Sequence, residues 1–274
     1  MTLAYEHKAT LLKACNVSVS KGGVQILRDV NLEIKDIVRP DACIGQVVGL
    51  LGPSGVGKTT LFRVLAGLDA PDTGEVWIGE KQVPVERGMV GVVAQQYPLF
   101  EHRTVLGNLL VAGSRAGLSD AAAHAKAMGL LKRFALEDRI RLYPPQLSGG
   151  QRQRVAITQQ FMCSEHFLLL DEPFSGLDPI AIDRVCTLLA EVAAMDELNT
   201  IVVVTHDISA ALEVADTIWL MGRDRDAEGN PVPGARIVET YDLIERGLAW
   251  RHGITNTPEF TLALREIRKR FQTL

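Results

Sequence analysis

The stretch that decides the fold is Gly52-Pro53-Ser54-Gly55-Val56-Gly57-Lys58-Thr59-Thr60. It fits the pattern G-x-x-x-x-G-K-S/T, in which a glycine-rich turn joins a strand to a helix. The apolar residues 46–51 before it predict the strand, and residues 60–66 after it predict the helix. Glycines allow the tight backbone turn, and the N–H groups at the start of a helix bind anions. The stretch therefore predicts a phosphate-binding loop, or P-loop.

Each part of this loop has a chemical task. The Lys58 ammonium would reach the β- and γ-phosphates of a nucleotide, and the Thr59 hydroxyl would be a ligand of Mg²⁺. The backbone N–H groups of the loop would surround the phosphates. The alternative is a glycine turn that matches by chance, and the flanking strand and helix argue against it.

Composition indicates a globular protein. The chain has 274 residues, of which 47% are hydrophobic and 23% are charged, so it can bury the core of one or two domains. A net charge of −4 gives no electrostatic reason to expect nucleic acid. No apolar run approaches the roughly 18 residues of a membrane span, and the N-terminus does not resemble a signal peptide. The 4 cysteines form no C-x-x-C pair, so we expect reduced thiols in a cytosolic protein.

Apolar runs predict strands on both sides of a helical block. The expected strands cover residues 11–20, 24–34, 46–51, 75–78, 89–93, 167–171 and 201–204, with a late hairpin of 218–221 and 235–238. Residues 104–134 favour helix, with an N-cap at Ser119-Asp120, and further helices are expected over residues 152–162, 182–194 and 257–271. A loop is expected over residues 36–44. The continuous apolar strands suit a parallel sheet that helices cover on both faces.

Two further motifs carry possible chemistry. An apolar strand ends in Asp171-Glu172, where Asp171 could hold the Mg²⁺ shell and Glu172 could deprotonate water. The alternative is a solvated acidic turn. The second motif is Leu147-Ser148-Gly149-Gly150-Gln151, which places two glycine N–H groups and a serine hydroxyl at a helix start. On its own, this motif reads as a plain helix cap.

Together the motifs resemble the ATP-binding cassette (ABC) family, specifically the nucleotide-binding subunit of a transporter. The P-loop, the signature residues 147–151 and the Walker B strand 168–172 match in order and spacing. Gln95 matches the Q-loop glutamine, Asp178 in residues 175–178 matches the D-loop, and His206 matches the switch histidine. The resemblance covers residues 12–240 approximately.

The resemblance implies an α/β fold. It consists of a P-loop NTPase core, with a mostly parallel sheet, flanking helices and an antiparallel β subdomain, and an inserted α-helical subdomain. We expect the ATPase domain to cover residues 1–240, with the helical subdomain at about residues 96–165. Residues 241–274 would form a short C-terminal helical extension.

The resemblance also implies a mechanism. Two such subunits would pair head to tail and enclose two ATP molecules, so that Ser148, Gly149, Gly150 and Gln151 of one face the nucleotide of the other. In this scheme the catalytic residues are Lys58, Gln95, Glu172 as general base and His206. The expected Mg²⁺ ligands are Thr59, Gln95 and Asp171, and the nucleotide would contact Gly52, Pro53, Ser54, Gly55, Val56, Gly57, Lys58, Thr59, Thr60 and Asp178.

Three positions depart from the family pattern. Lys21 stands where the family usually has an aromatic residue that stacks on adenine. The helix after the signature continues with Thr158-Gln159-Gln160 rather than with arginine, and residues 36–45 form a longer link than usual. The first departure concerns the base of the nucleotide; the other two leave the catalytic residues intact.

Two classes of cassette protein remain open. In the first, the chain is the ATPase of a transporter, peripheral to the cytoplasmic face of the cell membrane and bound to transmembrane permease subunits. In the second, it is a soluble ATPase that acts on a protein or nucleic-acid partner. The single cassette and the short helical block favour the transporter. Residues 95–105 are similar to importer ATPases for polar amino acids or for nitrate, sulfonate or taurine, which implies a solute-binding protein as a further partner.

Overall fold

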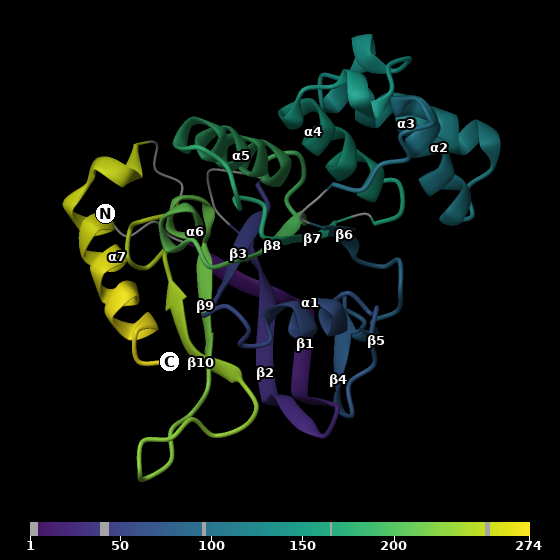
Figure 1. The fold of residues 1–274 in the computed structure, drawn as a ribbon. Coiled ribbons are helices and arrows are strands. Elements are labelled where there is room, and N and C mark those ends of the chain that lie inside the picture. Colours follow the sequence, from purple (N-terminus) through teal and green to yellow (C-terminus); the bar gives the residue numbers. More distant parts are fainter. Residues whose placement is uncertain (1–4, 39–43, 95–96, 165, 250–252) are drawn as a thin grey trace.

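The computed structural model describes residues 5–38, 44–94, 97–164, 166–249 and 253–274. These residues form two sheets (Figure 1). The smaller sheet is antiparallel and has the strand order β2–β1–β4–β5. Its strands are β1 (Glu6–Lys21), β2 (Val24–Val38), β4 (Thr73–Ile78) and β5 (Val83–Pro84).

The larger sheet has the order β10–β9–β3–β8–β7–β6 and is parallel except for its last strand, β10, which runs antiparallel to β9. Its strands are β3 (Gln46–Leu51), β6 (Gly91–Val93), β7 (Phe167–Asp171), β8 (Thr200–Thr205), β9 (Thr217–Gly222) and β10 (Arg236–Asp242). Every residue of β3 and β8 is buried, as the continuous apolar runs predict for strands covered on both faces.

Strand register brings the predicted motifs to one edge of this sheet. Leu51, the last residue of β3, pairs with Thr205 of β8 and Leu220 of β9. Asp171, the last residue of β7, pairs with Val204. Parallel strands have their carboxyl ends on the same edge, so the segments that follow β3, β7 and β8 meet there.

Helices cover the larger sheet and form the block between β6 and β7. The helices α1 (Lys58–Leu65), α5 (Pro179–Ala193) and α6 (Ile208–Val214) follow strands of the sheet. The block contains α2 (Val105–Arg115), α3 (Asp120–Arg133), α4 (Gly149–Gln160) and the short 3₁₀ turns Glu137–Arg139 and Pro144–Gln146. Figure 1 shows this block at the upper right, set off from the two sheets. The domain boundaries that we assign around it remain a prediction.

The sequence misplaced several element ends. The strand expected to end at residue 34 continues to Val38, so the expected loop starts later than residue 36. The strand expected over residues 89–93 is limited to Gly91–Val93. The residues that favour helix over 104–134 form two helices, and the N-cap expected at Ser119 is confirmed: its hydroxyl accepts from the N–H of Ala122. The helix that residues 147–151 are expected to open begins at Gly149, inside the motif, rather than at residue 152.

The C-terminal segment ends in α7 (Pro258–Phe271), preceded by the 3₁₀ turn Ile254–Asn256. The Thr257 hydroxyl accepts from the N–H of Phe260, and Pro258 occupies the first turn, as the sequence predicts. Phe260 and Ile267 are buried in a hydrophobic cluster with residues of α6, β9 and β10. The apolar stripe of α7 therefore packs on its own chain.

Candidate active site

The P-loop connects β3 to α1 through a backbone that requires glycine at several positions. Gly55 and Gly57 have φ values of 75° and 118°, in the region that favours glycine. A Cβ atom at Gly52 would lie 2.7 Å from the carbonyl oxygen of Met221, so the close approach of β9 excludes a side chain there. Gly57 is the N-cap of α1 and supplies no side-chain acceptor for the first N–H groups of this helix. These N–H groups are therefore available to an anion.

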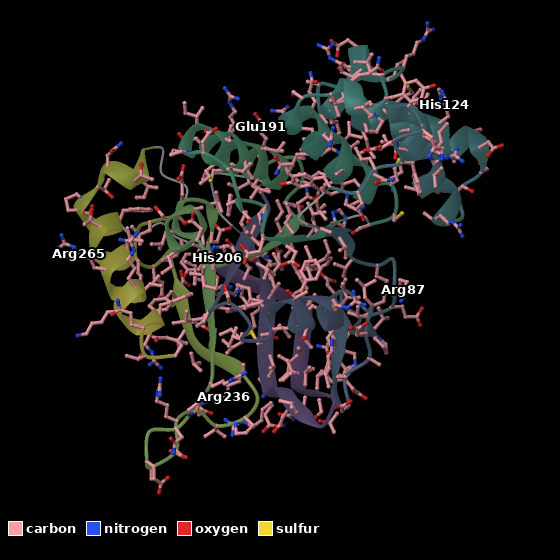
Figure 2. All side chains as sticks on the ribbon, in the orientation of Figure 1. Arg87, His124, Glu191, His206, Arg236 and Arg265 are labelled. Carbon is pink, nitrogen blue, oxygen red and sulfur yellow. The ribbon has the colours of Figure 1, made fainter. Side chains whose placement is uncertain are left out.

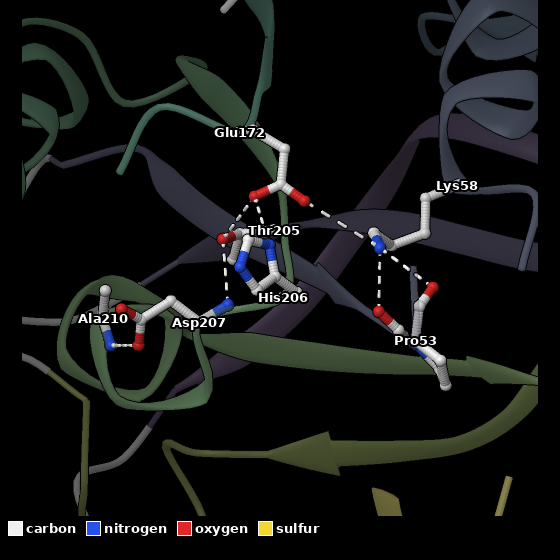
Figure 3. A network of polar contacts seen from close by, with 8 residues as sticks. Pro53, Lys58, Glu172, Thr205, His206, Asp207 and Ala210 are labelled. Atoms are coloured by element: carbon white, nitrogen blue, oxygen red, sulfur yellow. Dashed lines mark hydrogen bonds and ion pairs between the residues drawn. The ribbon is translucent and has the colours of Figure 1, made fainter. Parts of the chain in front are cut away.

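Lys58 is buried at the first position of α1. Its ammonium donates to the carbonyl oxygens of Gly52 at 2.8 Å and Pro53 at 3.2 Å, and lies 3.9 Å from Oε1 of Glu172 (Figure 3). Burial lowers the pKa of Lys58, while the charges of Glu172 and Asp171 oppose this shift. The ammonium is thus held over the loop by partners that phosphate oxygens could replace.

Glu172 follows β7 in a left-handed conformation, with φ of 49°. Such a φ is uncommon outside glycine, and it persists here because the Glu172 N–H donates to the carbonyl oxygen of Val204 at 2.7 Å. Its Oε2 atom accepts from the Thr205 hydroxyl at 3.1 Å and lies 2.9 Å from Nδ1 of His206 (Figure 3). One carboxylate oxygen therefore faces Lys58 and the other faces the end of β8.

Two residues that the sequence analysis did not select hold this arrangement. Thr205 is fully buried, and its hydroxyl also accepts from the N–H of Asp207 at 3.1 Å. The Asp207 carboxylate accepts from the N–H of Ala210 at 3.0 Å and caps α6. An acidic residue directly after a strand and before a helix is a recognisable cap signal, so Asp207 could have been found from the sequence. The position of Thr205 required the pairing of β7 with β8.

Two of the three predicted metal ligands, Asp171 and Thr59, directly adjoin Glu172 and Lys58 in the chain. Asp171 ends β7 half-buried, and its pKa is raised by burial and by the charge of Glu172, against the effect of Lys58. Thr59 is exposed on the first turn of α1. Gln95 lies outside the described residues. Carboxylate and hydroxyl oxygens suit Mg²⁺, so Asp171 and Thr59 fit the ion that the sequence predicts.

The segment after Gln95 contacts the segment after Glu172. The Tyr97 hydroxyl donates to the carbonyl oxygen of Pro173 at 3.3 Å. Burial raises the pKa of Tyr97 to about 12, so the hydroxyl keeps its proton at neutral pH. No pattern in the sequence indicates this contact.

The signature residues lie at the start of α4, away from the P-loop in Figure 1. The Ser148 hydroxyl accepts from the N–H of Gln151 at 3.3 Å, and the Gln151 side chain accepts from the N–H of Ser148 at 3.0 Å. Gly149 and Gly150 are exposed, and a Cβ atom added at either position would have no neighbouring atom within 4 Å. Asp178 caps α5 by accepting from the N–H of Ala181 at 2.9 Å. The single chain therefore does not bring the signature to its own Lys58.

The position expected to hold adenine carries an exposed cation. The Lys21 ammonium lies 3.9 Å from Oδ2 of Asp69, whose carboxylate also accepts two 2.7 Å hydrogen bonds from Arg63. Tyr5, an aromatic residue that could in principle replace the missing ring at this position, donates to Asp242 at 2.8 Å and packs in the cluster around α7. The hydroxyl and the ring of Tyr5 therefore contact the C-terminal segment rather than the region around Lys21.

Comparison with known proteins identifies the class. The family model described as "ABC transporter" matches residues 37–175. A sulfate/thiosulfate import ATP-binding protein CysA of Gloeobacter violaceus is 37% identical over 92% of this chain and 73% of its own length. An arginine transport ATP-binding protein ArtP of Haemophilus influenzae is 36% identical over 79% of this chain and 90% of its own length.

The fold agrees with this match. The solved structure of cbiO1 from Clostridium perfringens, described as part of the ABC transporter complex cbiONQ, has a TM-score of 0.71 to this chain. It is 24% identical and covers 96% of this chain and 94% of its own. The chain belongs to the ABC transporter family. It is an ATP-binding subunit of that family and an ATP hydrolase, as the sequence predicts. The predicted α/β fold class is confirmed as well.

Helix length and polarity bear on membrane insertion. Among the residues that the structure describes, no helix is long and apolar enough to cross a bilayer.

Proposed function

We propose that this subunit binds ATP and Mg²⁺ between two head-to-tail copies and hydrolyses ATP to drive solute import through transmembrane permease subunits. The observation that carries the proposal is the position of Glu172 between Lys58 and His206, at the edge of the sheet where the P-loop begins. The relatives named above support import, since one is a sulfate/thiosulfate import protein and the other an arginine transport protein. These cargoes differ, so the proposal names no cargo.

Each residue of the site has its own part in this chemistry. Lys58 would exchange its contacts with Gly52 and Pro53 for phosphate oxygens and neutralise their charge. Glu172 would take a proton from the attacking water as the new bond to the γ-phosphorus forms and the bond to the ADP oxygen breaks. His206 would hold the carboxylate in place through its 2.9 Å contact with Oε2. Mg²⁺ would neutralise charge at the phosphates, and Thr59, Asp171 and Gln95 would be its protein ligands.

The signature residues support the pairing of two copies. Ser148, Gly149 and Gly150 form an exposed helix start that lies apart from the P-loop of the same chain (Figure 1). A second copy could present this helix start to the nucleotide, because anions are stabilised there. Gln151 and Asp178 would lie at the same contact between the copies.

The test is purification of the full subunit from membranes with its permease. We expect co-purification with a transmembrane protein, retention on the cytoplasmic face, and ATP turnover that rises when a solute-binding protein loaded with its solute is added. Co-purification with ribosomes or another soluble partner, without any transmembrane protein, would instead support the second class of cassette ATPase.

A further inference from the structure

A pocket of about 510 Å³ lies between the β9–β10 loop and the C-terminal end of α7. Figure 1 shows this loop projecting from the end of the larger sheet, with the C-terminus beside β10. The pocket is lined from the loop by Arg223, Asp224 and Arg225, from β10 by Val238, and from the helix end by Arg270, Gln272, Thr273 and Leu274. Three arginines therefore converge on one cavity outside the nucleotide site.

The guanidinium of Arg223 has a hydrogen-bond donor that pairs with no described residue. Its Nε atom is shielded from solvent and has no hydrogen-bond partner, and no carboxylate of the described chain pairs with its guanidinium. Shielded N–H groups are nearly always paired in folded proteins, because leaving one unpaired sacrifices its hydrogen bond to water. Because Nε itself is closed to solvent, a partner in the cavity would meet the solvent-facing part of the Arg223 guanidinium, and its binding would change the surroundings of Nε.

Arg225 also carries an uncompensated charge. It donates to the carbonyl oxygens of Thr273 at 3.2 Å and Gly229 at 2.8 Å, and within the described residues it pairs with no carboxylate. Arg270 differs, since its guanidinium pairs with Glu239 at 3.0 Å. The pocket thus offers two positive charges, from Arg223 and Arg225, that lack a negative partner within the described part of the chain.

The two carboxylates of the β9–β10 loop, Asp224 and Asp226, already pair with other groups. Asp224 accepts two 2.8 Å hydrogen bonds from Arg236 and pairs with Arg28 of β2. Asp226 accepts from the N–H groups of Glu228 at 3.1 Å and Asn230 at 2.7 Å, and so folds the tip of the loop. Neither carboxylate neutralises Arg223 or Arg225.

We propose that this pocket binds a small oxyanion with two negative charges, such as sulfate or hydrogen phosphate. Guanidinium groups present N–H donors in a planar fork that matches oxyanion geometry, and two of them balance a dianion. The Thr273 hydroxyl and the Gln272 amide add neutral polar groups to the lining. A bound anion would join the β9–β10 loop to the end of α7. This proposal does not depend on the transport function.

The experiment must separate this pocket from the P-loop, which also binds oxyanions. The full subunit is therefore kept saturated with ADP and Mg²⁺, and sodium sulfate or sodium phosphate is titrated at constant ionic strength against sodium chloride. The readout for the parent, Arg225→Gln and the control is the ¹⁵N-correlated Nε–H signal of Arg223, assigned by its loss in Arg223→Gln. For Arg223→Gln, which lacks this signal, the readout is the shift in the unfolding temperature as the anion is added.

We expect saturable binding of both anions, weakened about tenfold or more in Arg223→Gln and in Arg225→Gln, since one charged hydrogen bond contributes that much. The matched control is Arg265→Gln, which removes an exposed arginine on the outer face of α7 (Figure 2) and should leave the affinity unchanged. Arg225→Gln is the second variant because the Arg225 side chain is exposed, and the loss of its hydrogen bonds to Thr273 and Gly229 is measured separately as the unfolding temperature without added anion. Equal binding in both pocket variants and the parent, or the same response to chloride, would overturn the proposal.

Discussion

The Nδ1 atom of His206 lies 2.9 Å from Oε2 of Glu172, although 34 positions separate the two residues in the chain. The contact follows from the parallel pairing of β7 with β8, in which Asp171 is the partner of Val204. Each strand ends directly before its functional side chain, so the register of the pair fixes the contact. Variants of this centre and of the packing around it can therefore be tested one contact at a time.

Replacing Glu172 with glutamine should abolish turnover and preserve ATP binding. The change keeps the shape of the side chain and removes the proton acceptor, which typically lowers the rate by about 10²–10⁴-fold. ATP-bound dimers should accumulate and can be measured by light scattering with the permease present. Glu197→Gln, at an exposed carboxylate remote from the site, is the control and should turn over normally. Normal turnover in Glu172→Gln would remove this residue from the role of base.

Thr205→Val should lower both stability and turnover. The hydroxyl donates to Glu172 and accepts from the N–H of Asp207, so valine leaves a polar group unpaired at a cost of about 1–3 kcal/mol in the free energy of unfolding. Denaturant unfolding and ATPase rate are the two measurements. Thr205→Ser should recover most of both. Thr200→Val, on the same buried strand, loses only a 3.3 Å bond to Leu198 and should keep parental turnover.

Gly150→Asp should block dimerisation with ATP while the monomer still folds and binds ATP. Open space surrounds this glycine in the single chain, so an added carboxylate meets no neighbour there. In the proposed dimer it would face the partner's phosphates, and like charges repel strongly in a poorly hydrated site. Light scattering in the Glu172→Gln background tests this. Gly129→Asp, at an equally open glycine on α3, is the control. Dimers that persist in Gly150→Asp would exclude the head-to-tail arrangement.

Ile267→Ala should destabilise the isolated subunit. Ile267 is fully buried on the inner face of α7, and removing a buried isoleucine side chain costs about 2–5 kcal/mol. Leu262 on the same helix is 64% exposed, so Leu262→Ala should change the free energy of unfolding by less than about 0.5 kcal/mol. Urea unfolding of the two variants gives the comparison. Equal and small effects would mean that α7 does not pack on the core in solution.

Lys21→Tyr should tighten ATP binding several-fold without altering the catalytic residues. An aromatic face contributes about 1–3 kcal/mol when a base stacks on it. The lost contact between Lys21 and Asp69 is exposed and contributes little, and Asp69 retains Arg63. Dissociation constants of ATP and GTP at one Mg²⁺ concentration test this, with Lys8→Tyr at the exposed start of β1 as control. A strong ATP preference in the parent that Lys21→Tyr leaves unchanged would show that another residue reads the base.

Local signals predicted most of the elements. The run of apolar residues before Gly52 and the glycines after it predicted β3, the P-loop and α1, because strand burial and tight turns leave direct traces in composition. Ser148, Ser119 and Thr257 marked helix starts for the same reason. Element ends were less certain: β2 continues to Val38 because its pairing with β1 extends to Glu6, and pairing is not a local property.

The sequence by itself determined the family, because its motifs depend on residue types at short spacing. The catalytic roles of Glu172 and His206 remain predictions that the resemblance implies. Tertiary structure decided which side chains meet. The register of β7 on β8 placed His206 and Thr205 on Glu172, and the approach of Met221 explains Gly52. The convergence of Arg223, Arg225 and Arg270 likewise depends on α7 folding back beside β10. Such contacts join residues far apart in the chain, and short-range patterns carry no record of them.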